Sequence, residues 1–208
     1  MNSTTLLLVR HGKTVGSEEL RYKGHIDVPL SEEGIKEVEA LARIIKGHFN
    51  PVSKIYCSDL SRAKQTAEII AGSLGLEPLA MNVLRERSFG LWEGMSFEEI
   101  ASAYPEEFER WKSDPYRFSP PEGESTEDVK NRVVPAVEEI INRHRGERVM
   151  VVSHGGVTRV LLCHYLGIPL NNIFRIEQDF ACLNVLEFFD DGFTLIRLIN
   201  GRSWQVNG

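Results

Sequence analysis

The 208-residue sequence predicts an α/β fold, a three-layer α/β/α sandwich around a mostly parallel sheet with an antiparallel edge. Short apolar runs alternate along the chain with amphipathic segments, which is typical of parallel strands and their connecting helices. Two β-rich segments near the end, joined by Asp190-Asp191-Gly192, predict a closing hairpin. Since the length suits one hydrophobic core, we expect residues 1–208 to form a single domain.

The first predicted strand is Thr5–Val9, which is apolar on both faces and is followed by Gly12. This pattern favours a central parallel strand over an exposed antiparallel one. Residues 31–47 predict the first helix, with Ser31 as its N-cap. Its apolar residues recur at helical spacing: Ile35, Val38, Leu41 and Ile45.

The same alternation continues with a strand at 52–58, a helix at 59–75, a late strand at 148–153 and a helix at 157–167. Residues 184–189 and 193–199 predict the two strands of the hairpin.

Residues 88–124 differ in character, because they are rich in aromatics, Gly and Pro and helical only in patches. Ser96 and Glu99 have the spacing of a helix capping box, and Ser125 to Asp128 has the S-x-x-D pattern that starts another helix. We expect 88–124 to form a lid-like insertion over one edge of the sheet.

Composition restricts the partners of the chain. The net charge of −6 argues against a general nucleic-acid or membrane surface, and no apolar run approaches the length of a membrane span. The first residues lack the pattern of a signal peptide, so we expect a cytoplasmic protein. Cys57, Cys163 and Cys182 lie in apolar surroundings without a C-x-x-C pair, which favours buried free thiols.

Charged and polar residues follow three of the predicted parallel strands. In open parallel sheets ligands bind beyond the carboxyl ends of the strands, so we expect these residues to meet there. They are Arg10 and His11 after the first strand, Ser58 and Arg62 after the second, and His154, Gly155 and Gly156 after the late strand. Each group alone has a simpler explanation as a surface or solvated feature; their equivalent positions favour a shared site.

A phosphate group fits this cluster of cations. Arginine offers paired hydrogen bonds to phosphoryl oxygens without losing its charge, and the helix that starts near Gly156 adds backbone N–H donors. A neutral histidine adds a nucleophile near neutral pH.

The motifs LLLVRHGKT, RYKGHIDVPLSEEG, IYCSDLSRAKQTA, LRERSFGLWEG, PEGES and VVSHGG together resemble the histidine phosphatase superfamily in order and over nearly the whole chain. The resemblance implies a phosphoglycerate mutase-like fold and a metal-independent reaction without a cofactor. It implies that His11 is the nucleophile that becomes a phosphohistidine and that Glu86 is the general acid and then the base. Arg10, Arg62 and His154 would clamp the phosphoryl oxygens, with Ser17, Gly24 and Gly155 as further phosphate-binding residues.

Two positions depart from the family pattern. Lys13 stands where a Glu is usual, and Ser17 stands where many members place a phosphate-contacting Asn. Lys13 either makes the mouth of the site more positive or is a solvated surface charge. Ser17 keeps one donor but has a shorter reach.

The acidic insertion resembles the phosphatase branch, and the run from FGLWEG to QDFACLNVLEF is similar to α-ribazole phosphatases. We therefore expect hydrolysis of a small phosphorylated metabolite, with α-ribazole 5′-phosphate as a candidate substrate. The alternatives are a cofactor-dependent phosphoglycerate mutase, a broad-specificity sugar or phosphoglycerate phosphatase and a non-catalytic phospholigand-binding module. The aromatic residues of the insertion either line a lid or form its own small core. The sequence does not determine the oligomeric state, and a homodimer is one of the alternatives.

Overall fold

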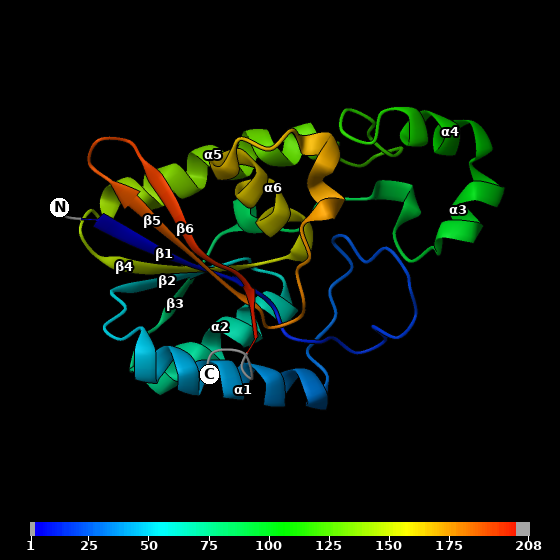
Figure 1. Ribbon diagram of the computed structural model, residues 1–208. Helices are drawn as coiled ribbons and strands as arrows, with labels where there is room; N and C mark the ends of the chain where they lie inside the picture. Colours follow the sequence, from blue (N-terminus) through cyan, green and yellow to red (C-terminus); the bar gives the residue numbers. More distant parts are fainter. Residues whose placement is uncertain (1–2, 203–208) are drawn as a thin grey trace.

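A computed structural model describes residues 3–202. Its six-stranded sheet has the order β3-β2-β4-β1-β5-β6 (Figure 1). The first four of these strands are parallel to one another, whereas β5 and β6 are antiparallel, so the predicted fold class is confirmed. The strands are β1 (Ser3–Arg10), β2 (Lys54–Cys57), β3 (Pro78–Ala80), β4 (Arg148–Ser153), β5 (Leu183–Phe189) and β6 (Thr194–Gly201).

Helices cover both faces of the sheet (Figure 1). On one face lie α1 (Glu32–His48) and α2 (Ser61–Leu74), and on the other lie α5 (Thr126–Arg143) and α6 (Gly155–Leu166). Alternate residues of β1 serve the two cores, because Leu7 and Val9 pack with α1 and α2 while Leu6 and Leu8 pack with α5 and α6.

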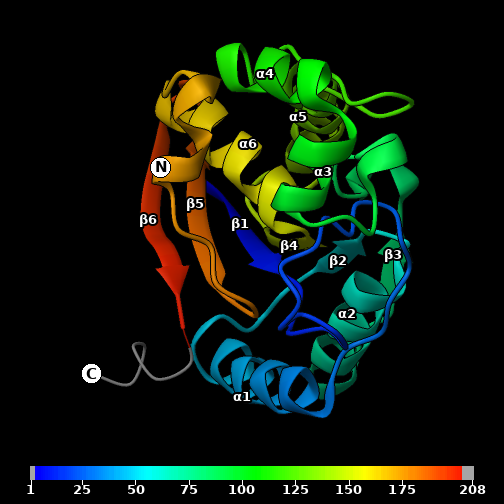
Figure 2. The ribbon, with the colours of Figure 1, turned by 90° about the vertical axis from the view of Figure 1, so that its right-hand side faces the viewer.

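The strand β1 lies inside the sheet as expected, but only one of its neighbours is parallel. It pairs with β4 in parallel and with β5 in antiparallel orientation. The pairing of Arg10 with Ser153 aligns the carboxyl ends of β1 and β4, so the residues after the two strands meet at one edge. Figure 2 looks onto that edge.

One expectation for α1 is wrong. Ile35 is 39% exposed, and Gly34 faces the interior in its place. The reason is a close backbone approach, because a Cβ on Gly34 would lie 2.0 Å from the carbonyl oxygen of Lys13. Gly12 is constrained in the same way, since its Cβ would lie 2.8 Å from the carbonyl oxygen of Gly34. Two glycines therefore let the loop after β1 press against the start of α1.

Residues 88–124 hold η2 (Gly90–Trp92), α3 (Phe97–Ala103) and α4 (Pro105–Ser113), at the edge where the parallel strands end (Figures 1 and 2). Their buried side chains form a cluster apart from the two sheet cores: Trp92, Ile100, Phe108 and Phe118. Both predicted capping boxes are present, at the starts of α3 and α5. Two more short helices complete the order, η1 (Asn82–Leu84) and η3 (Leu170–Arg175).

The three cysteines are buried and unbridged, as the sequence indicates. Within residues 3–202, none of the helices combines the length and apolarity that a bilayer span requires.

Candidate active site

A pocket of about 290 Å³ opens at the carboxyl edge of the sheet. Its walls come from the end of β1, the loop after it, α2, the segment after η1 and the segment before β5. The structure thus brings together the residues that the sequence placed at equivalent strand ends. The residues that the following paragraphs use are Arg10, His11, Ser17, Arg62, Glu86 and Phe180.

His11 is buried, with 6% of its surface exposed. Its Nδ1 lies 2.8 Å from the carbonyl oxygen of Gly12. Because a carbonyl only accepts hydrogen bonds, Nδ1 carries the proton of the neutral ring and Nε2 keeps its lone pair. Burial, together with the positive charges of Arg10 and Arg62, lowers the pKa of His11 well below 6.5. His11 is therefore neutral at pH 7, with an unprotonated Nε2.

The Arg10 side chain is positioned by the segment that precedes β5. Its Nη1 donates to the carbonyl oxygen of Gln178 at 2.5 Å, and its guanidinium carbon lies 4.1 Å from the centre of the Phe180 ring. Its buried Nε has no hydrogen-bond partner within the described part of the chain. Burial lowers the pKa of Arg10, although a guanidinium stays charged. One donor of this cation is thus available to an anion.

Arg62 projects from the first turn of α2 and is 2% exposed. It donates to the carbonyl oxygens of Gly24 at 2.7 Å and Ile26 at 2.9 Å. Gly24 has a φ of 48°, and a Cβ there would lie 2.2 Å from a carboxylate oxygen of Glu93. Gly24 therefore reaches the site through its carbonyl, which orients Arg62.

His154 is fully buried at the N-cap of α6. Its Nε2 lies 2.8 Å from Ser58 Oγ, and its ring centre is 5.2 Å from that of His11. Nδ1 is buried and has no partner among residues 3–202. Burial, then the neighbouring His11 and Arg62, lowers the pKa of His154 well below 6.5. The two histidines are thus neutral rings set edge to face between cations.

Glu86 belongs to the segment after η1, and its side chain contacts the N-terminal end of α6. Its Oε1 accepts from the backbone N–H of Arg87 at 2.9 Å, and its Oε2 accepts from that of Gly156 at 2.9 Å. A Cβ on Gly156 would lie 2.4 Å from Oε1, so a side chain there would displace the carboxylate of Glu86. Of the backbone donors expected at the start of this helix, the N–H of Gly156 is thus used by the carboxylate of Glu86.

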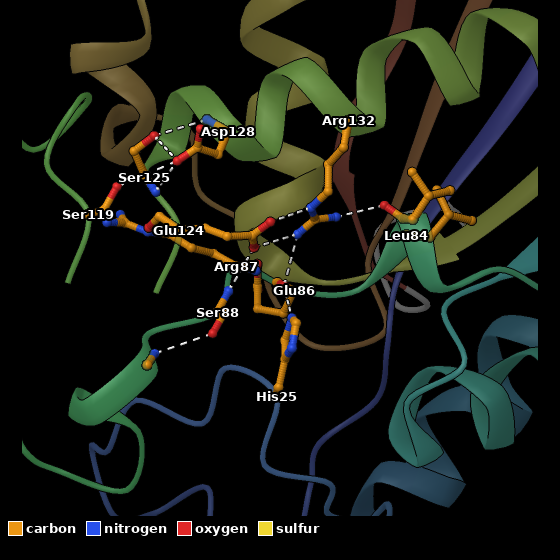
Figure 3. A network of polar contacts seen from close by, with 12 residues as sticks. His25, Leu84, Glu86, Arg87, Ser88, Ser119, Glu124, Ser125, Asp128 and Arg132 are labelled. Atoms are coloured by element: carbon orange, nitrogen blue, oxygen red, sulfur yellow. Dashed lines mark hydrogen bonds and ion pairs between the residues drawn. The ribbon is translucent and has the colours of Figure 1, made fainter. Parts of the chain in front are cut away.

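Side chains from two other segments fix the backbone of Glu86 (Figure 3). Its carbonyl oxygen accepts from Arg132 Nη2 at 3.0 Å and from His25 Nε2 at 2.8 Å. Arg132, on α5, also donates to the carbonyl oxygen of Val83 at 2.6 Å. It pairs through two nitrogens with Glu124, at 2.7 and 2.9 Å. These bonds hold the segment that carries Glu86 against α5.

Glu124 connects this network to the insertion. Its Oε2 accepts from the backbone N–H of Ser88 at 2.9 Å, and its carbonyl oxygen accepts from Arg87 Nε at 2.6 Å. Burial raises the pKa of Glu124, but the hydrogen bonds from Arg132 and Ser88 outweigh it, so the pKa is lowered. The ionised carboxylate thus ties 86–88 to α5.

The remaining predicted residues divide into two groups. Ser17 lines the pocket, and its buried Oγ has no partner within the described range. Gly155 admits Arg10, since a Cβ there would lie 3.2 Å from Arg10 Nε. Lys13 lies outside the pocket lining, where its Nζ pairs with Glu33 at 2.5 Å. Of the two interpretations of Lys13, the structure supports the surface charge.

The aromatic residues of the insertion also divide. Trp92 and Phe118 are buried in its own cluster, and Phe97 is 44% exposed. Tyr116 hydrogen-bonds Glu127 instead of facing the site. Phe89 borders the pocket, and it lines a neighbouring cavity together with Trp111. The insertion therefore has its own small core, and Phe89 and Trp111 line cavities; its role as a lid stays a prediction.

The sequence analysis did not identify the residues that hold Arg10, His11 and Gly12 in position. Gln178 and Phe180 hold Arg10, and the backbone N–H of Ala181 donates to the carbonyl oxygen of His11 at 3.0 Å. Thr66 accepts from the N–H of Gly12 at 3.2 Å. Thr66 follows Arg62 by one helical turn, which was a usable signal, whereas 178–181 lies in a segment without periodicity.

Comparison with protein families decides the relationship. Residues 6–201 match the model of the histidine phosphatase superfamily, branch 1. The chain belongs to this superfamily. Among residues 3–202 of this chain, no group of three or more His, Cys, Asp or Glu is arranged to hold a metal ion.

A bifunctional protein of Mycobacterium tuberculosis is 38% identical over 197 residues, 95% of this chain and 54% of that protein. The chain thus spans about half the length of that relative. Phosphoserine phosphatase 1 of Hydrogenobacter thermophilus is 35% identical over 93% of this chain and 90% of its own. The crystal structure of a putative α-ribazole-5′-P phosphatase from Escherichia coli superposes with a TM-score of 0.87 at 27% identity, covering 97% of this chain and 98% of that one. The phosphoglycerate mutase-like fold is thereby confirmed.

Proposed function

We propose that this histidine phosphatase relative is a metal-independent phosphomonoester hydrolase that works through a phosphohistidine on His11. The observation that carries the proposal is the state of His11, a neutral ring whose Nε2 lone pair is left free by the Nδ1 bond to Gly12. It lies in a pocket with Arg10 and Arg62, whose charges match those that develop on phosphoryl oxygens in the transition state.

In the first step His11 Nε2 attacks phosphorus as the ester P–O bond breaks. The leaving oxygen takes a proton from Glu86, so an alcohol departs. In the second step Glu86 accepts a proton from water, which attacks phosphorus as the P–N bond breaks, and inorganic phosphate forms. Arg10, Arg62 and His154 hold the phosphoryl oxygens, with a hydrogen bond from Ser17, whose buried Oγ lines the pocket. Gly24 and Gly155 act indirectly, by letting the two arginines take their positions.

We place the substrate among small phosphorylated metabolites, with residues 88–124 as a lid on the single domain. Two candidate substrates come from relatives. α-Ribazole 5′-phosphate is supported by the likeness to the Escherichia coli protein and by the aromatic walls at Phe89 and Trp111. Phosphoserine is supported by the higher identity to the Hydrogenobacter enzyme.

The test is phosphate release from a panel of phosphomonoesters in excess chelator, with His11→Ala beside the unaltered protein. The panel holds α-ribazole 5′-phosphate, phosphoserine, 3-phosphoglycerate and phenyl phosphate. We expect turnover that the chelator does not affect and that His11→Ala lacks. Activity lost to the chelator, or kept by His11→Ala, contradicts the mechanism. Isomerisation of 3-phosphoglycerate primed by its bisphosphate, with little phosphate released, contradicts hydrolysis.

A further inference from the structure

A second cavity, of about 180 Å³, lies beside the first. Tyr22, Glu86 and Phe89 border both, so the two are neighbours across the proposed acid. In the proposed reaction Glu86 protonates the leaving oxygen, which places the rest of the leaving group next to this carboxylate. The second cavity is therefore positioned to receive it.

The walls of this leaving-group cavity are largely apolar. Tyr22, Phe89, Trp111 and Phe174 contribute aromatic rings, and Val160 and Ile173 contribute aliphatic side chains. Phe174, on η3, is 71% exposed, so a large apolar ring stands open to solvent at this cavity. A leaving group with an apolar body would cover this surface, and removing apolar surface from water is favourable.

Two cations line the cavity, and they differ in their partners. The guanidinium of Arg87 donates to Glu124, Thr126 and Phe118. Arg159, on α6, donates through Nε to the carbonyl oxygen of Ile176 at 2.8 Å. Within residues 3–202, its Nη1 and Nη2 make no hydrogen bond or ion pair. Arg159 thus has unused donors.

Arg159 also lies close to another positive charge. A Cβ on Gly155 would lie 3.3 Å from Arg159 Nη1 and 3.2 Å from Arg10 Nε, so the two guanidinium groups approach the same glycine. Arg159 contributes to lowering the pKa of Arg10, as expected for neighbouring cations. Of the carboxylates in the described part of the chain, Glu86 alone borders the cavity. An unpaired cation in an apolar cavity favours an anion.

We propose that this cavity selects phosphomonoesters whose leaving group carries a carboxylate on an apolar body, and that Arg159 binds the carboxylate. The proposal rests on the proposed phosphatase function and narrows it. Neither candidate substrate above meets both requirements: phosphoserine brings an ammonium and no apolar body, and α-ribazole 5′-phosphate brings no carboxylate.

The experiment compares kcat/KM for 4-carboxyphenyl phosphate and phenyl phosphate. The ratio of the two is measured in the unaltered protein, in Arg159→Met and in Arg175→Met. Arg175 is an exposed arginine on η3 outside the cavity lining, so its replacement removes the same charge nearby. Using a ratio cancels the intrinsic reactivity of the two esters.

We expect the ratio to fall by about 10-fold or more in Arg159→Met, the size of a lost charge-assisted hydrogen bond, and to stay the same in Arg175→Met. An equal ratio in all three proteins overturns the proposal. Hydrolysis of phenyl phosphate that depends on His11 would in that case leave the phosphatase function standing, whereas no hydrolysis of either ester refutes the function itself.

A second measurement needs no variant. The proposal predicts that 4-hydroxybenzoate inhibits the unaltered protein about 10-fold more strongly than 4-(hydroxymethyl)phenol, a neutral molecule of similar size. Equal inhibition, or stronger inhibition by the neutral compound, overturns it. This result stands even if Arg159→Met does not fold.

Discussion

The two ends of the site are built in different ways. At the phosphate end, His11, Arg62 and His154 are buried, and they follow strands of the sheet. At the leaving-group end, α5 and α6 still form part of the wall, but the insertion and η3 add Phe89, Trp111 and Phe174, and Phe174 is exposed to solvent. The groups proposed to hold the phosphate thus follow strands of the sheet, whereas part of the surface proposed to recognise the leaving group comes from segments outside the two sheet cores.

Glu86 lies between the two ends, so its loss gives the largest effect among these predictions. We expect Glu86→Gln to lower kcat/KM for an alkyl phosphate by about 10²–10⁴-fold, because an amide cannot protonate the leaving oxygen and kcat/KM reports the steps up to the departure of the alcohol. For 4-nitrophenyl phosphate the loss is much smaller, since a nitrophenolate leaves without a proton. Steady-state phosphate release on both esters measures this. A loss of equal size for both contradicts the role of Glu86 as the acid.

The link between the two ends is the Arg132 network on the backbone of Glu86 (Figure 3). We expect Arg132→Met to lower kcat/KM for an alkyl phosphate by up to about 10²-fold, because the carboxylate loses its fixed position. The loss should again be smaller for 4-nitrophenyl phosphate, which a general loss of structure would not produce.

Arg143→Met is the matched control for that change. Arg143 lies on the same helix, is exposed and pairs with Glu139 at the surface. Activity of Arg132→Met equal to that of Arg143→Met would show that the network does not position Glu86.

The phosphate end makes a prediction about pH. Burial lowers the pKa of His11 and of His154 well below 6.5. As the pH falls below about 6.5 the unfolded chain takes up protons on these histidines and the folded chain does not, so the free energy of unfolding falls. Each histidine contributes up to about 1.4 kcal/mol per pH unit in this window.

Urea unfolding between pH 7 and 5 measures this slope. We expect the free energy of unfolding of His11→Asn to fall less steeply with decreasing pH than that of the unaltered protein. The difference is the contribution of one histidine. Parallel curves for the two proteins would mean that His11 titrates alike in the folded and unfolded states.

The smallest effect is expected at Lys13, where this chain departs from its family. Its ammonium pairs with Glu33 at the surface, away from the pocket lining. Lys13→Ala should change kcat/KM by less than about twofold, since Lys13 lies outside the pocket lining and exposed ion pairs contribute little. A loss of tenfold or more would place Lys13 in the substrate path.

The sequence predicted which residues meet at the carboxyl edge of the sheet, but not which residues line the leaving-group cavity, and the reason is physical. Arg10, His11 and His154 follow apolar strands whose period and order are readable, and parallel strands end at one edge. The docking of Glu86 on the start of α6 depends on a contact between segments 70 positions apart, which no local pattern records. Phe180, which packs on Arg10, likewise lies in a segment without periodicity.

The family resemblance supplied what the pattern lacked. It singled out Glu86, which is an ordinary charge between two arginines in the sequence. It did not separate the aromatic residues of 88–124 into core and cavity wall. Trp92, on η2, is buried in the core of the insertion, whereas Trp111, on α4, reaches the leaving-group cavity.

The central claim is that phosphate passes through His11. The direct measurement is rapid acid-free quenching of the protein during turnover of 4-nitrophenyl phosphate, followed by intact mass and peptide mapping. We predict one added phosphoryl group, on His11, that is labile to acid, forms at the rate of nitrophenolate release and is absent from His11→Ala. Nitrophenolate release with no phosphorylated protein, or with the phosphoryl group on another residue, would contradict the account.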